Sequence, residues 1–182
     1  DFPVYAGAGK PLLRSLVTAE EVHGKTGLDG VELHEPVCPL QPVHAVPYLI
    51  DTLRKADDAS ITICPIGPLT NIAQALSLAP DIGRAIKNIV LMGGNYFEAG
   101  NITPAAEFNF YVDPHAAQVV LQSGVPIAIL PLDVTHKATI TTPRMDVLRQ
   151  QPNANGSRLA GILQSYERFD TQKFGLEGGP LH

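Results

Sequence analysis

The sequence has few cysteines and no excess of positive charge, and each shortage excludes a class of proteins. Its 182 residues include two cysteines, Cys38 and Cys64, which lack the spacing of a zinc site or a redox motif. A disulfide scaffold is excluded, a single disulfide stays open, and we expect two reduced thiols in a cytoplasmic protein. The net charge is −5, so there is no basic surplus to bind a phosphate backbone, and we expect no nucleic-acid partner.

Long apolar runs and several familiar catalytic motifs are also missing. No run reaches the roughly 18 apolar residues that a membrane span needs, so we expect no membrane partner. Gly24-Lys25-Thr26 is not a phosphate loop, because Ala19 stands where that motif requires its first glycine. The six histidines lack zinc-site spacing, and no H-E-x-x-H, G-x-S-x-G or strand-linked G-x-G-x-x-G sequence occurs. A dinucleotide-binding dehydrogenase is therefore disfavoured.

The residues that are present predict an α/β fold. Sixteen glycines and sixteen prolines indicate many tight turns between short elements. Apolar runs that alternate with helical patterns predict an open, mostly parallel, Rossmann-like sheet with helices on both faces, within a single domain over residues 1–182. The expected strands are 61–66, 88–92 and 126–130; the expected helices are 12–17, 47–56, 70–78, one that begins at Asp113-Pro114, one that begins at Thr142-Pro143, and 157–171.

A polar segment follows the second of these strands, which ends at Met92-Gly93-Gly94. Asn101, Glu107 and Asn109 combine amide donors, amide acceptors and one carboxylate within ten residues. Sugar hydroxyls need that mixture, because each hydroxyl both donates and accepts a hydrogen bond. Ligands of parallel sheets bind at the carboxyl ends of the strands, where this segment is expected to lie. Polar loop residues more commonly bond to their own backbone, so both interpretations stay open on composition alone.

With these motifs the chain resembles the inosine–uridine preferring nucleoside hydrolases. The resemblance covers the whole chain and implies an α/β sheet of the nucleoside hydrolase type. It also implies hydrolysis of the N-glycosidic bond of purine or pyrimidine ribonucleosides to a free base and ribose, through an oxocarbenium-like transition state. The family holds one Ca²⁺, which orients the attacking water, and its members are usually homodimers or homotetramers. The motifs are Val22–Gly30, Gly67–Ala73, Ile89–Gly94, Gly100–Asn109, Asp113-Pro114, Leu132–His136 and Gly179–His182.

The resemblance also implies roles for individual residues. Three polar side chains match ribose-binding positions: Asn101, Glu107 and Asn109. Phe108 and Met92 match the pocket wall, and Tyr166 lies with Phe169 on the helix that closes over the base. His182 matches the histidine proposed to assist departure of the base, and His23 matches a base-side histidine. For calcium, the chain offers only the backbone carbonyl of Ile66. Asp133, His136, Asp29 and Asn71 are interpreted as structural caps and turn residues, and Asp113 as a helix cap.

The sequence departs from the family at both ends. The family's D-x-D-x-x-x-D-D cluster, which supplies calcium carboxylates and the expected general base, is not found, and no aspartate follows His182. We therefore expect these residues to form the central part of a hydrolase domain and to hold no Ca²⁺ by themselves. Two alternatives remain open: an inactive fragment or pseudoenzyme that keeps part of the ribose pocket, and a secreted sugar-binding protein with a similar layered fold.

Overall fold

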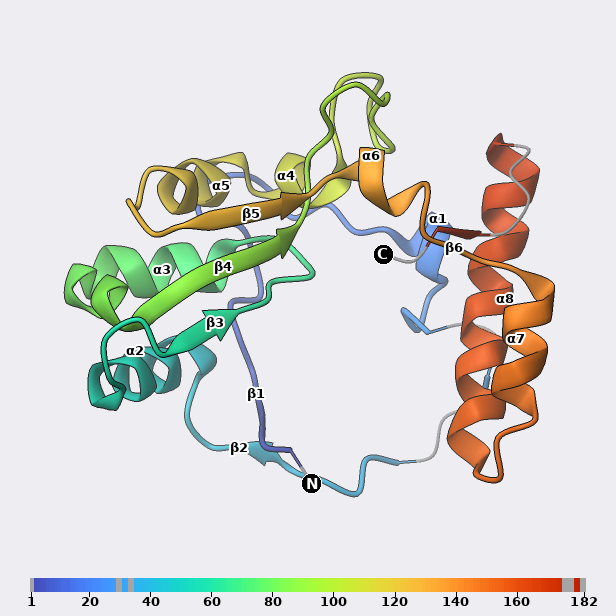
Figure 1. The fold of residues 1–182 in the computed structure, drawn as a ribbon, viewed down its shortest axis with the longest axis horizontal. Helices are drawn as coiled ribbons and strands as arrows, with labels where there is room; N and C mark the ends of the chain where they lie inside the picture. The colour runs from blue at the N-terminus through green and yellow to red at the C-terminus, as the bar shows by residue number, and fades with distance from the viewer. Residues whose placement is uncertain (1, 29–30, 33–34, 175–178, 181–182) are drawn as a thin grey trace. The chain divides into compact units, whose positions relative to one another are not determined.

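The computed structural model describes residues 2–28, 31–32, 35–174 and 179–180, without the side chains of Tyr166, residues 168–174 and Pro180. These residues form two compact units (Figure 1). The sheet unit consists of Asp1–Leu16 and Pro36–Asp133, and the helical unit consists of Val17–Glu35 and Val134–His182. Each unit is described separately.

The sheet unit is built on three parallel strands in the order β3-β4-β5. The middle strand, β4, pairs with both neighbours, with Ile63 opposite Ile89 on one side and Met92 opposite Leu130 on the other. A smaller parallel pair joins β1 and β2, where the Tyr5 ring stacks on Tyr48 at a centroid distance of 3.7 Å. The strands are β1 (Val4–Tyr5), β2 (Leu40–Gln41), β3 (Ile61–Ile63), β4 (Ile86–Met92) and β5 (Ile127–Leu130).

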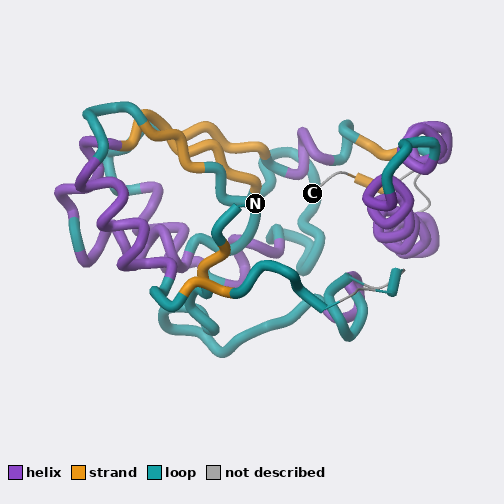
Figure 2. Tube along the Cα trace, turned by 90° about the horizontal axis from the view of Figure 1, so that it is seen from below, coloured by secondary structure: helices purple, strands orange, loops and turns teal. Residues whose placement is uncertain are grey.

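Helices of the sheet unit pack on one face of the three-stranded sheet, as Figure 2 shows. Ile89 and Leu91 of β4 are fully buried against them, and each such side chain contributes about 1.5–3 kcal/mol to folding. The opposite face is more open, because Cys64 and Ala128 are exposed. The helices are α2 (Ala45–Lys55), α3 (Thr70–Leu78), the 3₁₀ helix η1 (Pro80–Ala85), α4 (Phe108–Val112) and α5 (Pro114–Leu121).

The helical unit has its own small core of Ile140, Met145 and Ala160. Strands β6 (Thr139–Ile140) and β7 (Gly179–Pro180) form an antiparallel pair. The short helix α6 (Leu132–Thr135) joins the two units along the chain. The remaining helices are α1 (Glu20–His23), α7 (Thr142–Arg149) and α8 (Ala154–Phe174). Among the described residues, no helix has the length and apolar character needed to cross a membrane.

The α/β class with a parallel sheet, predicted from the apolar strands, is confirmed. The predicted helix at 70–78 is α3, and the helix predicted from Asp113-Pro114 is α5, with Asp113 as its N-cap. The strand predicted to run from 61 to 66 instead ends at Ile63, and Pro65, which has no N–H to donate, accepts a hydrogen bond from Met92 at 3.0 Å.

The helix expected over residues 12–17 is wrong, because long-range bonds hold this segment in another conformation. The Leu12 N–H donates to Asp113 Oδ2 at 2.9 Å, and the Arg14 guanidinium donates to the Tyr111 carbonyl. Both partners lie about 100 residues further along the chain, at α4 and the start of α5. Local periodicity carries no information about such partners, so tertiary contacts override the helical pattern.

Candidate functional site

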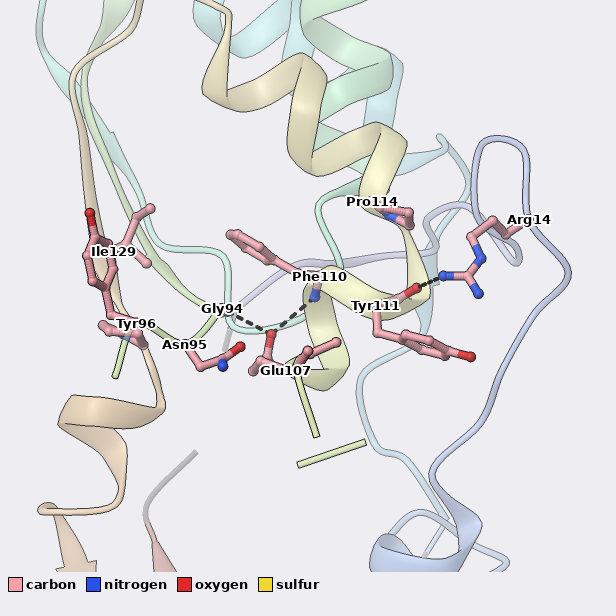
Figure 3. A pocket seen from close by; sticks show the side chains of 13 residues that line it. Arg14, Gly94, Asn95, Tyr96, Glu107, Phe110, Tyr111, Pro114 and Ile129 are labelled. Atoms are coloured by element: carbon pink, nitrogen blue, oxygen red, sulfur yellow. Dashed lines mark hydrogen bonds between the residues drawn. The ribbon is translucent and has the colours of Figure 1, made fainter. Parts of the chain in front are cut away.

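Glu107 joins the carboxyl end of β4 to the start of α4. Its side chain is only 2% exposed and caps α4, because Oε1 accepts from the Asn109 N–H at 2.8 Å and Oε2 accepts from the Phe110 N–H at 3.1 Å. Oε2 also accepts from the Gly94 N–H at 2.8 Å (Figure 3). Three main-chain donors therefore hold one carboxylate in place at the end of the strand.

The two asparagines of the polar segment lie in the same hydrogen-bonded cluster. The Asn109 amide nitrogen donates to the main-chain carbonyl of Met92 at 3.2 Å and contacts its sulfur at 3.3 Å. Asn101 Oδ1 accepts from the Phe108 N–H at 2.8 Å. The structure thus brings together five predicted site residues: Met92, Asn101, Glu107, Phe108 and Asn109.

The turn that carries Asn101 requires glycine at position 100. A Cβ at Gly100 would lie 2.2 Å from the carbonyl oxygens of both Thr103 and Ala106. The turn is closed by a bridge between Thr103 and Ala106. The close approach of the backbone fixes where Asn101 enters the cluster, two residues before the bridge.

This cluster retains capacity for a hydroxylated ligand. Within the described residues, no hydrogen bond uses the Asn101 amide nitrogen or the Asn109 amide oxygen. Glu107 accepts three bonds, whereas a carboxylate offers about four acceptor positions. One amide donor, one amide acceptor and one remaining carboxylate position match the needs of sugar hydroxyls, each of which donates and accepts.

A cavity of about 580 Å³ lies beside Glu107 within the sheet unit. Its walls come mainly from the β4–α4 loop, from α4 and from β5, and Tyr96, Phe110 and Tyr111 contribute rings (Figure 3). The guanidinium of Arg14 lies 4.3 Å from the centre of the Tyr111 ring at its rim. Of the five clustered residues only Glu107 lines this cavity.

The other predicted site residues lie elsewhere along the chain or outside the described residues. His23 ends α1 in the helical unit, where partial burial lowers its pKa. Tyr166 belongs to α8, and only its backbone is described, while His182 lies outside the described residues. Ile66 follows β3 and exposes 85% of its surface.

The described residues do not form a calcium site. Ca²⁺ takes six to eight oxygen ligands, several of them carboxylates. No group of three or more His, Cys, Asp or Glu side chains that could hold a metal is found in the described part of the chain. The Ile66 carbonyl alone is one neutral ligand, which is too few to hold Ca²⁺.

Sequence reasoning did not identify the main-chain donors or the cavity walls. The Gly94 N–H is a backbone group, and only the Gly93-Gly94 pair after a predicted strand hinted at a close approach. Arg14 was assigned to a helix, so nothing connected it with Tyr111. Tyr96 comes four residues after the end of β4, and this proximity to the strand end is the one signal that could place it at the cavity.

Comparison with known proteins agrees with the geometry. The family model described as inosine-uridine preferring nucleoside hydrolase matches residues 1–182. An uncharacterized protein of Schizosaccharomyces pombe is 50% identical over 182 residues, covering all of this chain and 59% of the relative. A pyrimidine-specific ribonucleoside hydrolase of Photobacterium profundum is 46% identical over 183 residues, covering all of this chain and 58% of the relative. The chain thus spans less than two thirds of the curated relatives it matches.

Solved structures show the same likeness. A purine-preferring ribonucleoside hydrolase from Gardnerella vaginalis superposes with a TM-score of 0.91 at 32% identity, covering 99% of this chain and 58% of that one. A plant nucleoside hydrolase has a TM-score of 0.91 at 28% identity, with 99% and 57% covered. Because the family model matches the entire chain, the chain belongs to the inosine-uridine preferring nucleoside hydrolase family.

Proposed function

We propose that the protein hydrolyses the N-glycosidic bond of ribonucleosides and that the cluster of Asn101, Glu107 and Asn109 binds the ribose. The observation that carries the proposal is the cluster itself, where amide and carboxylate groups meet at the carboxyl end of β4. In the reaction, the C1′–N bond breaks and the base leaves with the bonding electrons. A water oxygen bonds to C1′ and loses one proton, and the departing base gains one, so that one water molecule is consumed overall. On the family resemblance, Phe108 and Met92 are proposed to contact the ribose beside the cluster, although neither lines the cavity next to Glu107.

The contribution of the cluster to rate follows from the charge that develops on the sugar. The ribose ring becomes positively charged in an oxocarbenium-like transition state. A polar group whose bond to a ribose hydroxyl strengthens at that moment lowers the barrier rather than merely binding substrate. The Asn109 oxygen fits such a role, because its amide nitrogen is already fixed on the Met92 carbonyl and the side chain has little freedom to lose.

Pyrimidine ribonucleosides are the proposed preferred substrates. Support comes from the relative of Photobacterium profundum and from a relative in Enterobacter at 44% identity, both named pyrimidine-specific. The purine-preferring structure is more distant, at 32% identity. His182 is proposed to assist departure of the base, and His23 and Tyr166 to lie on the base side.

Three further properties are proposed on the family resemblance. The two units form one hydrolase domain, consistent with a family match that runs through both. The enzyme is proposed to be a homodimer or homotetramer, and to lie in the cytoplasm, where two unpaired cysteines would stay reduced. It uses Ca²⁺, with the Ile66 carbonyl as one ligand and carboxylates from outside the described residues as the others.

The test measures base release from uridine, cytidine and inosine, with Asn109→Ala as the site variant. Asn88→Ala is the matched control, because Asn88 lies near the start of β4, where it accepts a hydrogen bond from Thr62. We expect release of free base by the wild type and the control, faster for uridine than inosine, and a large loss for Asn109→Ala. Tight binding of ribose or nucleoside without turnover would instead identify a sugar-binding protein.

A further inference from the structure

Asp133 collects three consecutive main-chain donors of the loop that follows β4. Its Oδ2 accepts from the Tyr96 N–H at 2.8 Å, and its Oδ1 accepts from the Phe97 N–H at 2.8 Å and the Glu98 N–H at 3.3 Å. Asp133 lies 35 to 37 residues further along the chain, in α6 and three residues after the end of β5. One carboxylate therefore ties the ends of two neighbouring strands together.

These bonds favour the charged form of Asp133. Partial burial by itself raises the pKa of the carboxyl, but the N–H donors of Phe97, Tyr96 and Glu98 outweigh it, and the net pKa lies below the ordinary value of 3.8. The carboxylate is thus ionised near neutral pH, and its bonds to the loop are charge-assisted. These three bonds, called here the Asp133 lock, fix residues 96–98 in a loop that contains no helix or strand of its own.

The locked loop begins at the residue that contacts Glu107. The Gly94 carbonyl accepts from the Leu132 N–H at 3.0 Å, and the Gly94 N–H donates to Glu107 Oε2 at 2.8 Å. Gly94 has a φ of +72°, and a Cβ there would come within 3.2 Å of the Phe110 ring. Gly94 therefore adopts a backbone conformation that other residues rarely adopt. Its carbonyl is bonded to the Leu132 N–H, and its N–H is bonded to Glu107.

We propose that Asp133 is a positioning residue of the ribose site. By fixing residues 96–98 it keeps Gly94 in the conformation that directs its N–H at Glu107, and through Glu107 it fixes the start of α4 and the side chain of Asn109. This inference rests on the proposed function for its kinetic consequences, whereas the lock itself is a structural statement with its own test. Asp133 is given no contact with substrate.

The first test is amide hydrogen exchange in Asp133→Ala and Asp133→Asn. We expect exchange at Gly94 and at Tyr96–Glu98 to accelerate at least about ten-fold in Asp133→Ala, because local opening sets the exchange rate. Asp133→Asn should lie between wild type and alanine, since its single amide oxygen can still accept from Phe97 and Glu98 but its amide nitrogen faces the Tyr96 N–H. Asp81→Asn is the control, because the Asp81 carboxylate is exposed and pairs with Arg54, and neither residue belongs to the loop that Asp133 binds.

The second test is kinetic and asks whether the effect passes through Glu107. We expect Asp133→Ala to lower kcat/KM for uridine about 10- to 100-fold, mainly through kcat, because small displacements of a reacting site are costly. In the Glu107→Gln background the same change should cost clearly less, since the contact it supports is already weakened. If Asp133→Ala only destabilised the protein, it would lower kcat/KM by the same factor with Glu107 present and in the Glu107→Gln background.

The outcomes separate the two proposals. Unchanged exchange at Gly94 in both Asp133 variants overturns the lock. Accelerated exchange with equal losses in both Glu107 backgrounds overturns the positioning role. A wild-type protein that leaves uridine intact overturns the proposed function, and the exchange result then still decides whether Asp133 holds the loop.

Discussion

Glu107 Oε2 lies 2.8 Å from the main-chain nitrogen of Gly94, and this contact joins the end of β4 to the cap of α4. A residue matched to substrate binding is thus also a structural acceptor for three backbone donors. The two roles are compatible, because the donors fix the carboxylate in place before a sugar arrives. A change at Glu107 should therefore affect stability and, if the proposed function holds, substrate turnover as well.

Glu107→Gln should destabilise the protein by about 1–3 kcal/mol, because an amide nitrogen would replace one acceptor oxygen and leave a buried N–H without a partner. Urea unfolding measures the loss. The control is Glu21→Gln, at an exposed side chain of α1, which should change stability by about 0.5 kcal/mol or less. Equal stability of the two variants would show that the Glu107 bonds contribute nothing net.

Asn109→Ala should lower kcat more than it raises KM. The reason is that its bond to a ribose hydroxyl strengthens as positive charge develops on the ring. Steady-state kinetics with uridine gives the two parameters, and Asn88→Ala on β4 controls for the loss of a hydrogen-bonded asparagine outside the cluster. A change confined to KM would contradict this prediction. It would show that Asn109 binds the substrate and the transition state equally well.

Asp113→Ala should be more destabilising than a typical surface change. The fully buried Asp113 carboxylate accepts from the Leu12 N–H, the Thr70 hydroxyl and the Ala116 N–H. Removing it leaves three donors unsatisfied and uncaps α5, at a cost of roughly 2–4 kcal/mol. Thermal unfolding of Asp113→Ala and of Asp81→Asn measures the loss of stability in each variant. Equal losses would contradict the prediction and would mean that water replaces all three bonds.

His23 should titrate below its ordinary pKa of 6.5, because partial burial disfavours the charged imidazolium. The unfolded chain then binds this proton more readily than the folded one. The stability associated with neutral His23 is present above pH 6.5 and decreases as the pH falls below it. An NMR titration of the imidazole gives the midpoint, and a value at or above 6.5 would show that burial does not control it.

A polypeptide of residues 1–182 alone should bind no Ca²⁺ with micromolar affinity, because the described residues contain no carboxylate cluster. Isothermal calorimetry with added calcium is the measurement. Tight single-site binding would place the metal ligands within this sequence, with Glu107 as the first residue to change.

Local chemistry determined which elements the sequence could predict. The period of α3 and the Asp113-Pro114 start of α5 are short-range signals, and both elements form as predicted. The helix predicted over residues 12–17 is wrong, because the residues that bond to this segment, Asp113 and Tyr111, are distant in sequence. The polar side chains of the site were visible through their spacing and the family resemblance. The Gly94 N–H was not, because a backbone donor leaves no mark on the sequence.

The most direct measurement follows uridine turnover by proton and phosphorus NMR in phosphate buffer. Hydrolysis by water predicts uracil and free ribose in equal amounts, at a rate that does not depend on phosphate. Accumulation of ribose 1-phosphate, or turnover only when phosphate is added, would contradict the account and make the protein a phosphorylase.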